Sequence, residues 1–200
     1  MWQEIMSECA PFDWYTNNNV PFDYNCYNFT TVPHGSEEFR TWERKIYGDF
    51  NRGVTKIYKL ENPFLYARYL LKKEEYTAMG RRSPCVMELY HDTSEDKVHS
   101  IASRNLDWRL AKRVKFGKGV SFSPSPKYAN SKSSRKNGTQ RVMIIADVLV
   151  NKEQYVQYEN DPLDIPNKGF DTVVGNRKKV YVKFEDDEFY PKVFIFYNSF

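Results

Sequence analysis

The chain has 200 residues, of which 28% are charged and 16% are aromatic, and its formal net charge is +4 at pH 7. A chain of this length forms one domain with a large core, so neither a disulfide nor a bound metal is needed for folding. No apolar run approaches the roughly 18 residues of a membrane-spanning helix, so we expect no transmembrane helix. The mild positive charge favours anionic partners without identifying one.

The amino-terminal residues carry neither the charged region nor the apolar region of a secretion signal. The three cysteines, Cys9, Cys26 and Cys85, have no metal-binding spacing, and their odd number favours reduced thiols. We therefore expect an intracellular protein, cytoplasmic or nuclear, without a bound metal.

Residues 1–33 are rich in Asn, Pro and aromatic side chains and show no periodicity. This composition predicts an extended amino-terminal arm that packs on a domain formed by residues 34–200. The alternative is a remnant of a linker to a lost upstream domain. The arm's expected anchors are Trp2, Phe12, Trp14, Tyr15 and Phe22.

Two helices and one strand are predicted next. Ser36 caps a helix over residues 36–50, with Glu37 and Glu38 suited to its positive end. The alternating residues 53–60 indicate a strand. Asn62 and Pro63 then start a second helix that ends near Gly80.

The middle of the chain predicts a strand over residues 85–90 that delivers His91 at its end. Thr93 is the expected N-cap of a short helix, since Asp96 lies three residues further on. A Gly-rich turn at residues 117–119 then enters a strand at 120–122. A strand-end histidine that faces a Gly-rich strand entry is the layout of a cleft.

The remaining segments are mostly short strands. They are a helix at 125–133, a central strand at 141–150, a loop at 151–169, a strand at 170–174, and a hairpin of 179–184 with 192–197 whose turn holds the solvated acids 185–188. Many short strands with few helices predict an α+β domain built on an antiparallel or mixed sheet.

The motifs LYHDTS, NLDWR and FGKGVSFS together resemble the signature of the poly(ADP-ribose) polymerase (PARP) family. In that signature a strand ending in His-Gly-Ser/Thr is followed by a G-K-G-x-Tyr-Phe strand. The NLDWR run is similar to the branch of the CCCH-zinc-finger and TCDD-inducible PARPs and the zinc-finger antiviral protein. The resemblance covers residues 32–197 and implies the ADP-ribosyltransferase fold, in which two mixed or antiparallel sheets pack together with peripheral helices.

The family cleaves the bond between nicotinamide and ribose in NAD, its substrate, and it uses no metal. The resemblance implies that His91 binds a ribose hydroxyl and that the backbone of residue 92 holds the nicotinamide amide. A tyrosine at 121 and another at 132 would sandwich the nicotinamide ring. A serine at 129 would bind the amide, and a glutamate at 180 would support polymer elongation.

This chain keeps His91 and Gly119, and Thr93 keeps the hydroxyl that follows the histidine. Asp92 stands where the family has glycine; its carboxylate is expected near the pocket, strained there if the backbone φ is positive. The other substituted positions are Ser121, Ala129, Lys132 and Val180, so the triad positions are His91, Ser121 and Val180. Tyr128 or Ser131 takes one of these places if the helix register differs.

The sequence leaves three functions open. The first is a PARP-like domain with a degraded NAD site, not a polymerase, weak or inactive in transfer. The second is an active mono-ADP-ribosyltransferase that uses NAD and a protein acceptor. The third is an RNA- or protein-binding module, with basic clusters at 109–118 and 132–141 as the RNA surface. A solvated basic face is the simpler interpretation of those clusters.

Overall fold

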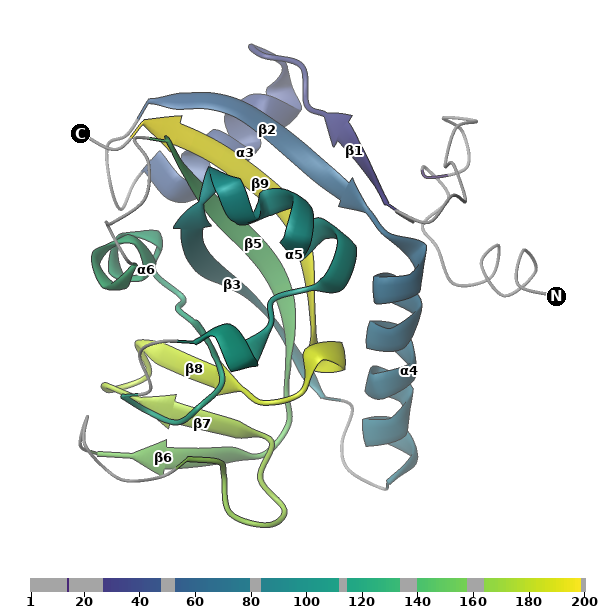
Figure 1. The fold of residues 1–200 in the computed structure, drawn as a ribbon, viewed down its shortest axis with the longest axis vertical. Helices are drawn as coiled ribbons and strands as arrows, with labels where there is room; N and C mark the ends of the chain where they lie inside the picture. The colour runs from purple at the N-terminus through teal and green to yellow at the C-terminus, as the bar shows by residue number, and fades with distance from the viewer. Residues whose placement is uncertain are drawn as a thin grey trace, which may run out of the picture.

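The computed structural model describes residues 14, 27–47, 53–79, 84–111, 115–133, 140–157 and 164–198. Within these ranges the chain forms two β-sheets with helices at their periphery (Figure 1). The predicted α+β class and the expected ADP-ribosyltransferase architecture are therefore confirmed.

The larger sheet has five strands and is antiparallel throughout. Its order is β1 (Asn28–Thr31), β2 (Val54–Glu61), β9 (Phe189–Asn198), β5 (Gln140–Val150) and β3 (Cys85–Ser94). Strand β5 lies between β9 and β3 and is buried along almost its whole length, as its uninterrupted apolar sequence predicts.

The smaller sheet has four strands and is mixed. Its order is β4 (Val120–Phe122), β8 (Val180–Lys183), β7 (Thr172–Gly175) and β6 (Glu153–Val156), and β6 and β7 run parallel. The two sheets meet where Tyr90 of β3 and Ser123, just after β4, exchange backbone hydrogen bonds of 2.8 and 2.9 Å. Phe122 and Phe189 pack across this junction with ring centroids 5.0 Å apart.

Two of the helices begin where the sequence predicts caps. The Ser36 hydroxyl accepts from the Phe39 amide at 3.0 Å, and Asn62 Oδ1 accepts from the Leu65 amide at 3.0 Å. The α-helices are α3 (Glu37–Tyr47), α4 (Pro63–Ala78), α5 (Val98–Arg104) and α6 (Pro126–Lys132). The 3₁₀ turns are η1 (Glu95–Lys97), η2 (Trp108–Leu110) and η3 (Asp186–Glu188).

Most of the predicted arm lies outside the described residues, as do Cys9, Cys26, Phe50 and Gly80. Trp14 packs against Tyr66 of α4 and Tyr190 of β9, with ring centroids 5.3 and 6.1 Å away. Strand β1 falls inside the range 1–33 and forms the edge of the larger sheet. The boundary between arm and domain stays a prediction.

The helix predicted to start at Thr93 begins later. Strand β3 pairs with β5 continuously from Cys85 to Ser94, so it runs three residues past His91. Thr93 is therefore a buried strand residue, and α5 begins at Val98 after the turn η1. The cross-strand register outweighs the local capping pattern, because β5 offers a partner as far as Arg141.

Three further expectations are wrong. The predicted loop at 151–169 contains β6, which pairs with β7. Strands β8 and β9 form no hairpin with each other, because β8 belongs to the smaller sheet and β9 to the larger one. Of the acids expected in a solvated turn, Glu188 is only 1% exposed.

A buried charge cluster explains why the chain changes sheets there. Lys183 of β8 is fully buried, and its Nζ lies 3.0 Å from Asp171 Oδ1 and 3.1 Å from Glu188 Oε1. The Thr172 hydroxyl accepts a further bond from Lys183 at 2.8 Å, and the Tyr76 hydroxyl of α4 donates to Glu188. The cluster thus links β7, β8 and η3 with α4.

The two carboxyl groups of this cluster have opposite pKa shifts. Burial acts to raise the pKa of Asp171, but the Lys183 ammonium and hydrogen-bond donors outweigh burial and lower it. Burial dominates at Glu188 and raises its pKa, although Lys183 and Tyr76 oppose the shift. Lysine 183 is therefore the partner that keeps two acids together in the core.

Replacing Lys183 by methionine tests this cluster. Because Lys183→Met leaves two buried acids without their cation, we expect the free energy of unfolding to fall by about 3–5 kcal/mol. Urea denaturation measures the change. Lys179→Met, on an exposed residue beside β8, is the matched control and should alter stability by less than about 0.5 kcal/mol. Equal stability of the two variants would contradict the assigned role.

Candidate functional site

His91 lies on β3 with its side chain half-buried against Phe122, at a ring-centroid distance of 6.0 Å. Its Nδ1 is 2.9 Å from the backbone oxygen of Ser121. A carbonyl oxygen only accepts, so Nδ1 carries the proton and Nε2 is left as an acceptor. Burial lowers the pKa of His91, and the bond to Ser121 and the charge of Asp92 offset this only in part. The neutral imidazole is the form that fits this environment.

Asp92 points to the opposite face of β3, as strand alternation requires. Its carboxylate is fully buried and forms an ion pair with Arg141, whose Nε lies 3.1 Å from Oδ1. The Tyr197 hydroxyl donates to the other carboxylate oxygen. The Asp92 carboxylate therefore does not lie near the nicotinamide pocket, where it is expected from the sequence. Residue 92 also does not have a positive φ, so aspartate causes no backbone strain there.

The backbone of residue 92 faces the free edge of β3. Tyr90 uses its amide and carbonyl groups to bond Ser123 at that edge. Backbone groups two residues further along a strand point the same way, so those of Asp92 face the same edge. There the backbone oxygen of Asp92 accepts a hydrogen bond from the Ser133 hydroxyl, at a distance of 3.0 Å.

Further bonds fix α6 and the residue after it to this edge. The Ser133 hydroxyl also accepts from Arg141, and Asn130 Nδ2 donates to the Tyr197 hydroxyl at 2.7 Å. Arg141 and Tyr197 are the two residues that hold the Asp92 carboxylate. One buried network therefore joins residue 92 to the carboxyl end of α6.

Gly119 and Ser121 differ in what they contribute. A Cβ at position 119 would overlap the backbone oxygen of Lys183, so only glycine allows this approach to β8. Ser121 is exposed and pairs with Val182 across β4 and β8. The pairing of β4 with β8 thus fixes position 121, but the short serine side chain offers no aromatic ring for stacking.

Val180 is 6% exposed and belongs to an apolar cluster on the smaller sheet. Three aromatic residues pack in that cluster, Phe116, Tyr128 and Phe184. The Phe116 ring lies directly on the backbone of Gly175, and Tyr128 of α6 is half-buried and accepts from Asn176 Nδ2 at 2.9 Å. Sequence reasoning gave Phe116 no role; its position directly before the G-K-G turn is the signal that points to it.

Ala129 and Lys132 of α6 differ in exposure. Ala129 is half-buried against the cluster that contains Tyr90 and Tyr197. Lys132 is exposed, and its ammonium lies 5.4 Å from the centre of the Tyr128 ring. The structure thus brings His91 and the Ser121 backbone into contact, while residues 128–132 border them from α6.

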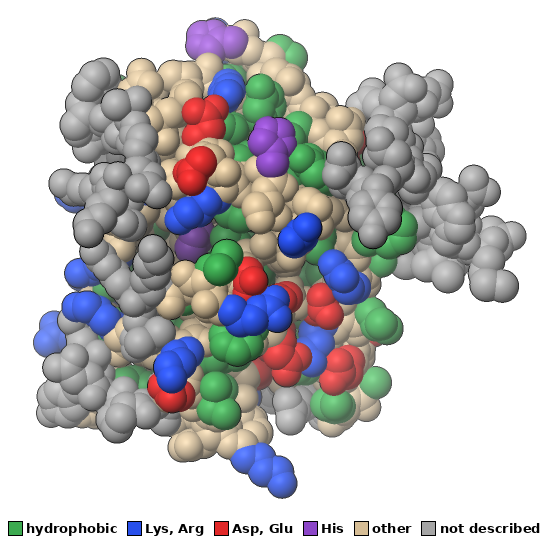
Figure 2. Space-filling model, viewed as in Figure 1, with side chains coloured by type: hydrophobic (Ala, Val, Ile, Leu, Met, Phe, Trp, Pro, Cys, Tyr) green, Lys and Arg blue, Asp and Glu red, His purple; other side chains and the backbone are tan. Residues whose placement is uncertain are grey.

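Three members of the predicted basic clusters are paired or buried in the structure. Arg109 contacts Asp107 at 2.7 Å, Lys118 contacts Asp164 at 2.8 Å, and Arg141 is buried. Basic and acidic side chains lie side by side over the lower part of the face drawn in Figure 2. The residues Lys112, Arg113, Arg135 and Lys136 lie outside the described ranges.

Among the described residues, no group of three or more His, Cys, Asp or Glu side chains is arranged to hold a metal ion. In the same part of the chain, each helix is too short or too polar to cross a bilayer.

The folded scaffold and the motifs around His91 define a class of domain. Residues 36–198, which make up most of the chain, match the family model of the poly(ADP-ribose) polymerase catalytic domain. The chain therefore belongs to this family, whose substrate is NAD.

Relatives within the family agree with the branch that the NLDWR run indicated. The chain is 26% identical over 185 residues to the protein mono-ADP-ribosyltransferase PARP12 of Mus musculus and 28% identical over 186 residues to PARP12 of Homo sapiens. Each match covers 84% of this chain and 25% of the relative. The mono-ADP-ribosyltransferase PARP11 of Mus musculus is 26% identical over 174 residues, covering 76% of this chain and 50% of the relative. The chain thus spans about a quarter of PARP12 and half of PARP11.

The lowered pKa of His91 gives a pH dependence. Between the lowered pKa of the folded state and about 6.5, the unfolded chain binds a proton at His91 that the folded chain does not. The His91 contribution to stability is therefore full above about pH 6.5 and falls with the pH below it. We expect the stability of the wild type relative to His91→Gln to decrease between about pH 7.5 and pH 5 in chemical denaturation. A constant difference would contradict burial of a neutral His91.

The Asp92 network gives a second prediction. Asp92→Gly restores the family residue but leaves the Arg141 guanidinium buried without its carboxylate, so we expect a loss of about 3–5 kcal/mol in unfolding free energy. Adding Arg141→Leu removes the unpaired charge. The double variant should therefore lose about 1–3 kcal/mol less unfolding free energy than the two single variants lose together, as measured in a double-mutant denaturation cycle. Strict additivity would show that the pair is not coupled.

Proposed function

We propose that this chain is a PARP-type ADP-ribosyltransferase domain whose NAD site is degraded. It does not synthesise polymer, and it transfers ADP-ribose weakly or not at all. Its scaffold then serves as a binding or interaction module.

The observation that carries this proposal is the hydrogen bond from the Ser133 hydroxyl to the backbone oxygen of Asp92, at 3.0 Å. The family relation implies that the backbone of this residue holds the amide of nicotinamide. A ligand amide would have to replace the Ser133 hydroxyl, which is itself bonded to Arg141. Because Arg141 is buried with Asp92, moving Ser133 disturbs a buried ion pair.

The ring-binding positions support the same proposal. Ser121 and Lys132 provide no aromatic faces where the family has two tyrosines. Stacking of a base on an aromatic side chain contributes about 1–3 kcal/mol in nucleic-acid binders, so loss of two faces weakens capture of nicotinamide strongly. Phe116 and Tyr128 do not replace them, because both are engaged in the apolar cluster around Val180.

The aliphatic residue at position 180 argues against polymer synthesis. Val180 is buried among apolar side chains and has no group that binds a ribose hydroxyl. The two glutamates that follow it in the sequence are engaged elsewhere: Glu188 with Lys183, and Glu185 with Lys72 at 2.7 Å. Neither takes over the role expected of a glutamate at 180.

A second candidate function is mono-ADP-ribosylation of a protein acceptor. It is favoured by the relatives, which are named protein mono-ADP-ribosyltransferases, and by the retained His91 and Gly119. Half-buried His91 keeps Nε2 as an acceptor for a ribose hydroxyl. An RNA-binding role through residues 109–118 and 132–141 stays a further proposal.

Calorimetry with nicotinamide and a labelling assay with NAD separate the first two candidates. We expect no heat of binding for nicotinamide at millimolar concentrations, and no transfer of label from radioactive NAD to the chain or to added proteins. The catalytic domain of mouse PARP12, assayed in parallel, is the positive control for the reagents.

Label transfer that disappears in His91→Ala would overturn the proposal in favour of the second candidate. Label that persists in His91→Ala would indicate a contaminating enzyme and leave the first candidate intact. The fold of His91→Ala is checked by its denaturation curve, so that loss of transfer is not mistaken for unfolding.

A further inference from the structure

A groove with an aromatic floor lies between α5 and the strands β1 and β2. Its cavity volume is about 310 Å³, near the lower limit of roughly 300 Å³ for small-molecule sites. The lining residues are Phe29, Thr31, Lys56, Tyr58, Glu95, Val98, His99 and Phe196. None of them is a position that the family relation assigns to NAD, so this groove is separate from the site around His91.

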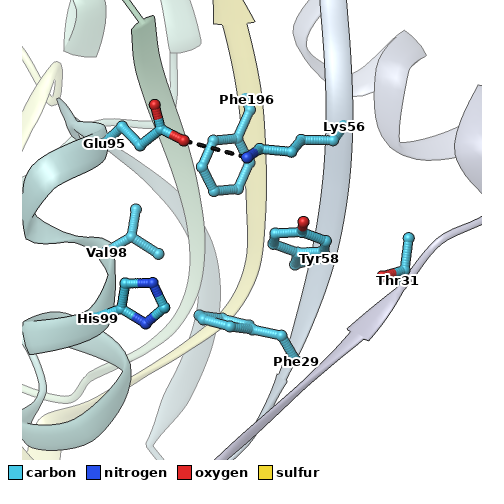
Figure 3. A pocket seen from close by; sticks show the side chains of 8 residues that line it. All are labelled: Phe29, Thr31, Lys56, Tyr58, Glu95, Val98, His99 and Phe196. Carbon is cyan, nitrogen blue, oxygen red and sulfur yellow. Dashed lines mark hydrogen bonds and ion pairs between the residues drawn. The ribbon is translucent and has the colours of Figure 1, made fainter. Parts of the chain in front are cut away.

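Three rings form the floor in succession (Figure 3). The ring centroids of Phe29 and Tyr58 are 5.4 Å apart with planes inclined by 27°, and those of Tyr58 and Phe196 are 5.3 Å apart. Phe29 and Tyr58 are half-buried, so they keep surface that a ligand can cover, whereas Phe196 is buried. A row of partly exposed rings favours a flat aromatic ligand.

Charged groups lie at one end of this floor. Lys56 Nζ is 4.2 Å from the centre of the Phe196 ring and 3.1 Å from Glu95 Oε1. The side chains of Lys56 and Glu95 are 36% and 42% exposed, so both keep contact with solvent. Ion pairs this exposed contribute little to stability, and an anionic ligand can therefore exchange with Glu95 for Lys56.

The walls add further polar groups. Figure 3 shows Glu95, Val98 and His99 on one side of the floor and Thr31 on the other. His99 is exposed and its Nδ1 lies 2.8 Å from the Tyr27 hydroxyl, which holds the ring at the rim. A hydroxyl at Thr31 and an imidazole at His99 thus face each other across the aromatic rings.

We propose that this groove binds a nucleoside phosphate, either free or at the end of a nucleic acid strand. The base lies on Phe29 and Tyr58, because aromatic rings accept any base face. The phosphate binds the Lys56 ammonium and displaces the Glu95 carboxylate. The net charge of +4 of the chain favours such an anion over a cation.

A cationic ligand and an anionic ligand would depend on different residues of the groove. A cationic ligand would use the rings and Glu95 and would have to expel Lys56. An anionic ligand needs Lys56 and is hindered by Glu95. The signs of two single substitutions therefore distinguish the two chemistries.

The test is calorimetric titration of the full chain with AMP, UMP and adenosine. We expect AMP and UMP to bind with similar affinity, and adenosine, which lacks the phosphate, at least tenfold more weakly. Lys56→Met should weaken AMP binding at least tenfold, and Glu95→Gln should strengthen it. Loss of AMP binding in Glu95→Gln, or gain in Lys56→Met, would overturn the proposal.

Two control variants accompany these measurements. Lys59→Met is matched to Lys56→Met, since Lys59 is on the same strand and has an ion pair of 3.1 Å with Glu38, but it does not line the groove. It should leave AMP binding unchanged. His91→Ala should also leave it unchanged, and weaker binding there would assign AMP to the family's NAD site instead. No measurable AMP binding by the wild type would reject the groove as a nucleotide site.

A short single-stranded RNA with a 5′ phosphate distinguishes the two sources. Affinity for this RNA well above that for AMP, abolished by Lys56→Met, points to the end of a nucleic acid strand. Equal affinities point to a free nucleotide. Either result supports the shared chemistry of a base on the rings and a phosphate on Lys56.

Discussion

The fully buried ammonium of Lys183 is the interaction on which the arrangement of the two sheets depends. A buried lysine needs carboxylates within contact distance. Asp171, directly before β7, and Glu188 of η3 supply them. Glu188 lies directly before β9, the strand that crosses the larger sheet. The chain therefore leaves the smaller sheet at a point fixed by charge. The same stretch of β8 accepts the close approach of Gly119, which sets the entry to β4.

From that anchor the geometry of the cleft follows in steps. Strand β4 is held by β8, and the Ser121 backbone then orients the His91 imidazole. On the other face of β3, Asp92 and Arg141 hold Ser133 and thereby the end of α6. Two buried ionic systems thus hold the elements around His91, one at Lys183 of β8 and one at Asp92 of β3. Neither system contains a side chain that the family relation assigns to NAD.

Elements with a strong local signal could be predicted from the sequence. The caps at Ser36 and Asn62 and the apolar run of β5 are read from a few neighbouring residues, and the structure agrees. The misplaced helix start at Thr93 and the false hairpin of β8 with β9 depend on distant partners. β3 continues because β5 lies beside it, and β8 is separated from β9 by the contacts of Lys183. Such partners have no signature within a short window of sequence.

The site shows the same division. The position of His91 and the need for glycine at 119 follow from motif residues and are present in the fold. The contacts of the Asp92 side chain could not be predicted from the sequence, because its partners are 49 and 105 residues away along the chain. The packing of Phe116 on Gly175 likewise joins residues from separate elements. A single chain gives no information about which distant residues vary together.

The pairing of Asp92 with Arg141 also has a consequence for how the sequence can change. Because the buried arginine relies on the aspartate, glycine at position 92 leaves a buried charge unpaired. A change at Arg141 first leaves the aspartate unpaired instead. Either order lowers the amount of folded protein before the second substitution is made. Positions 92 and 141 are therefore hard to exchange one residue at a time.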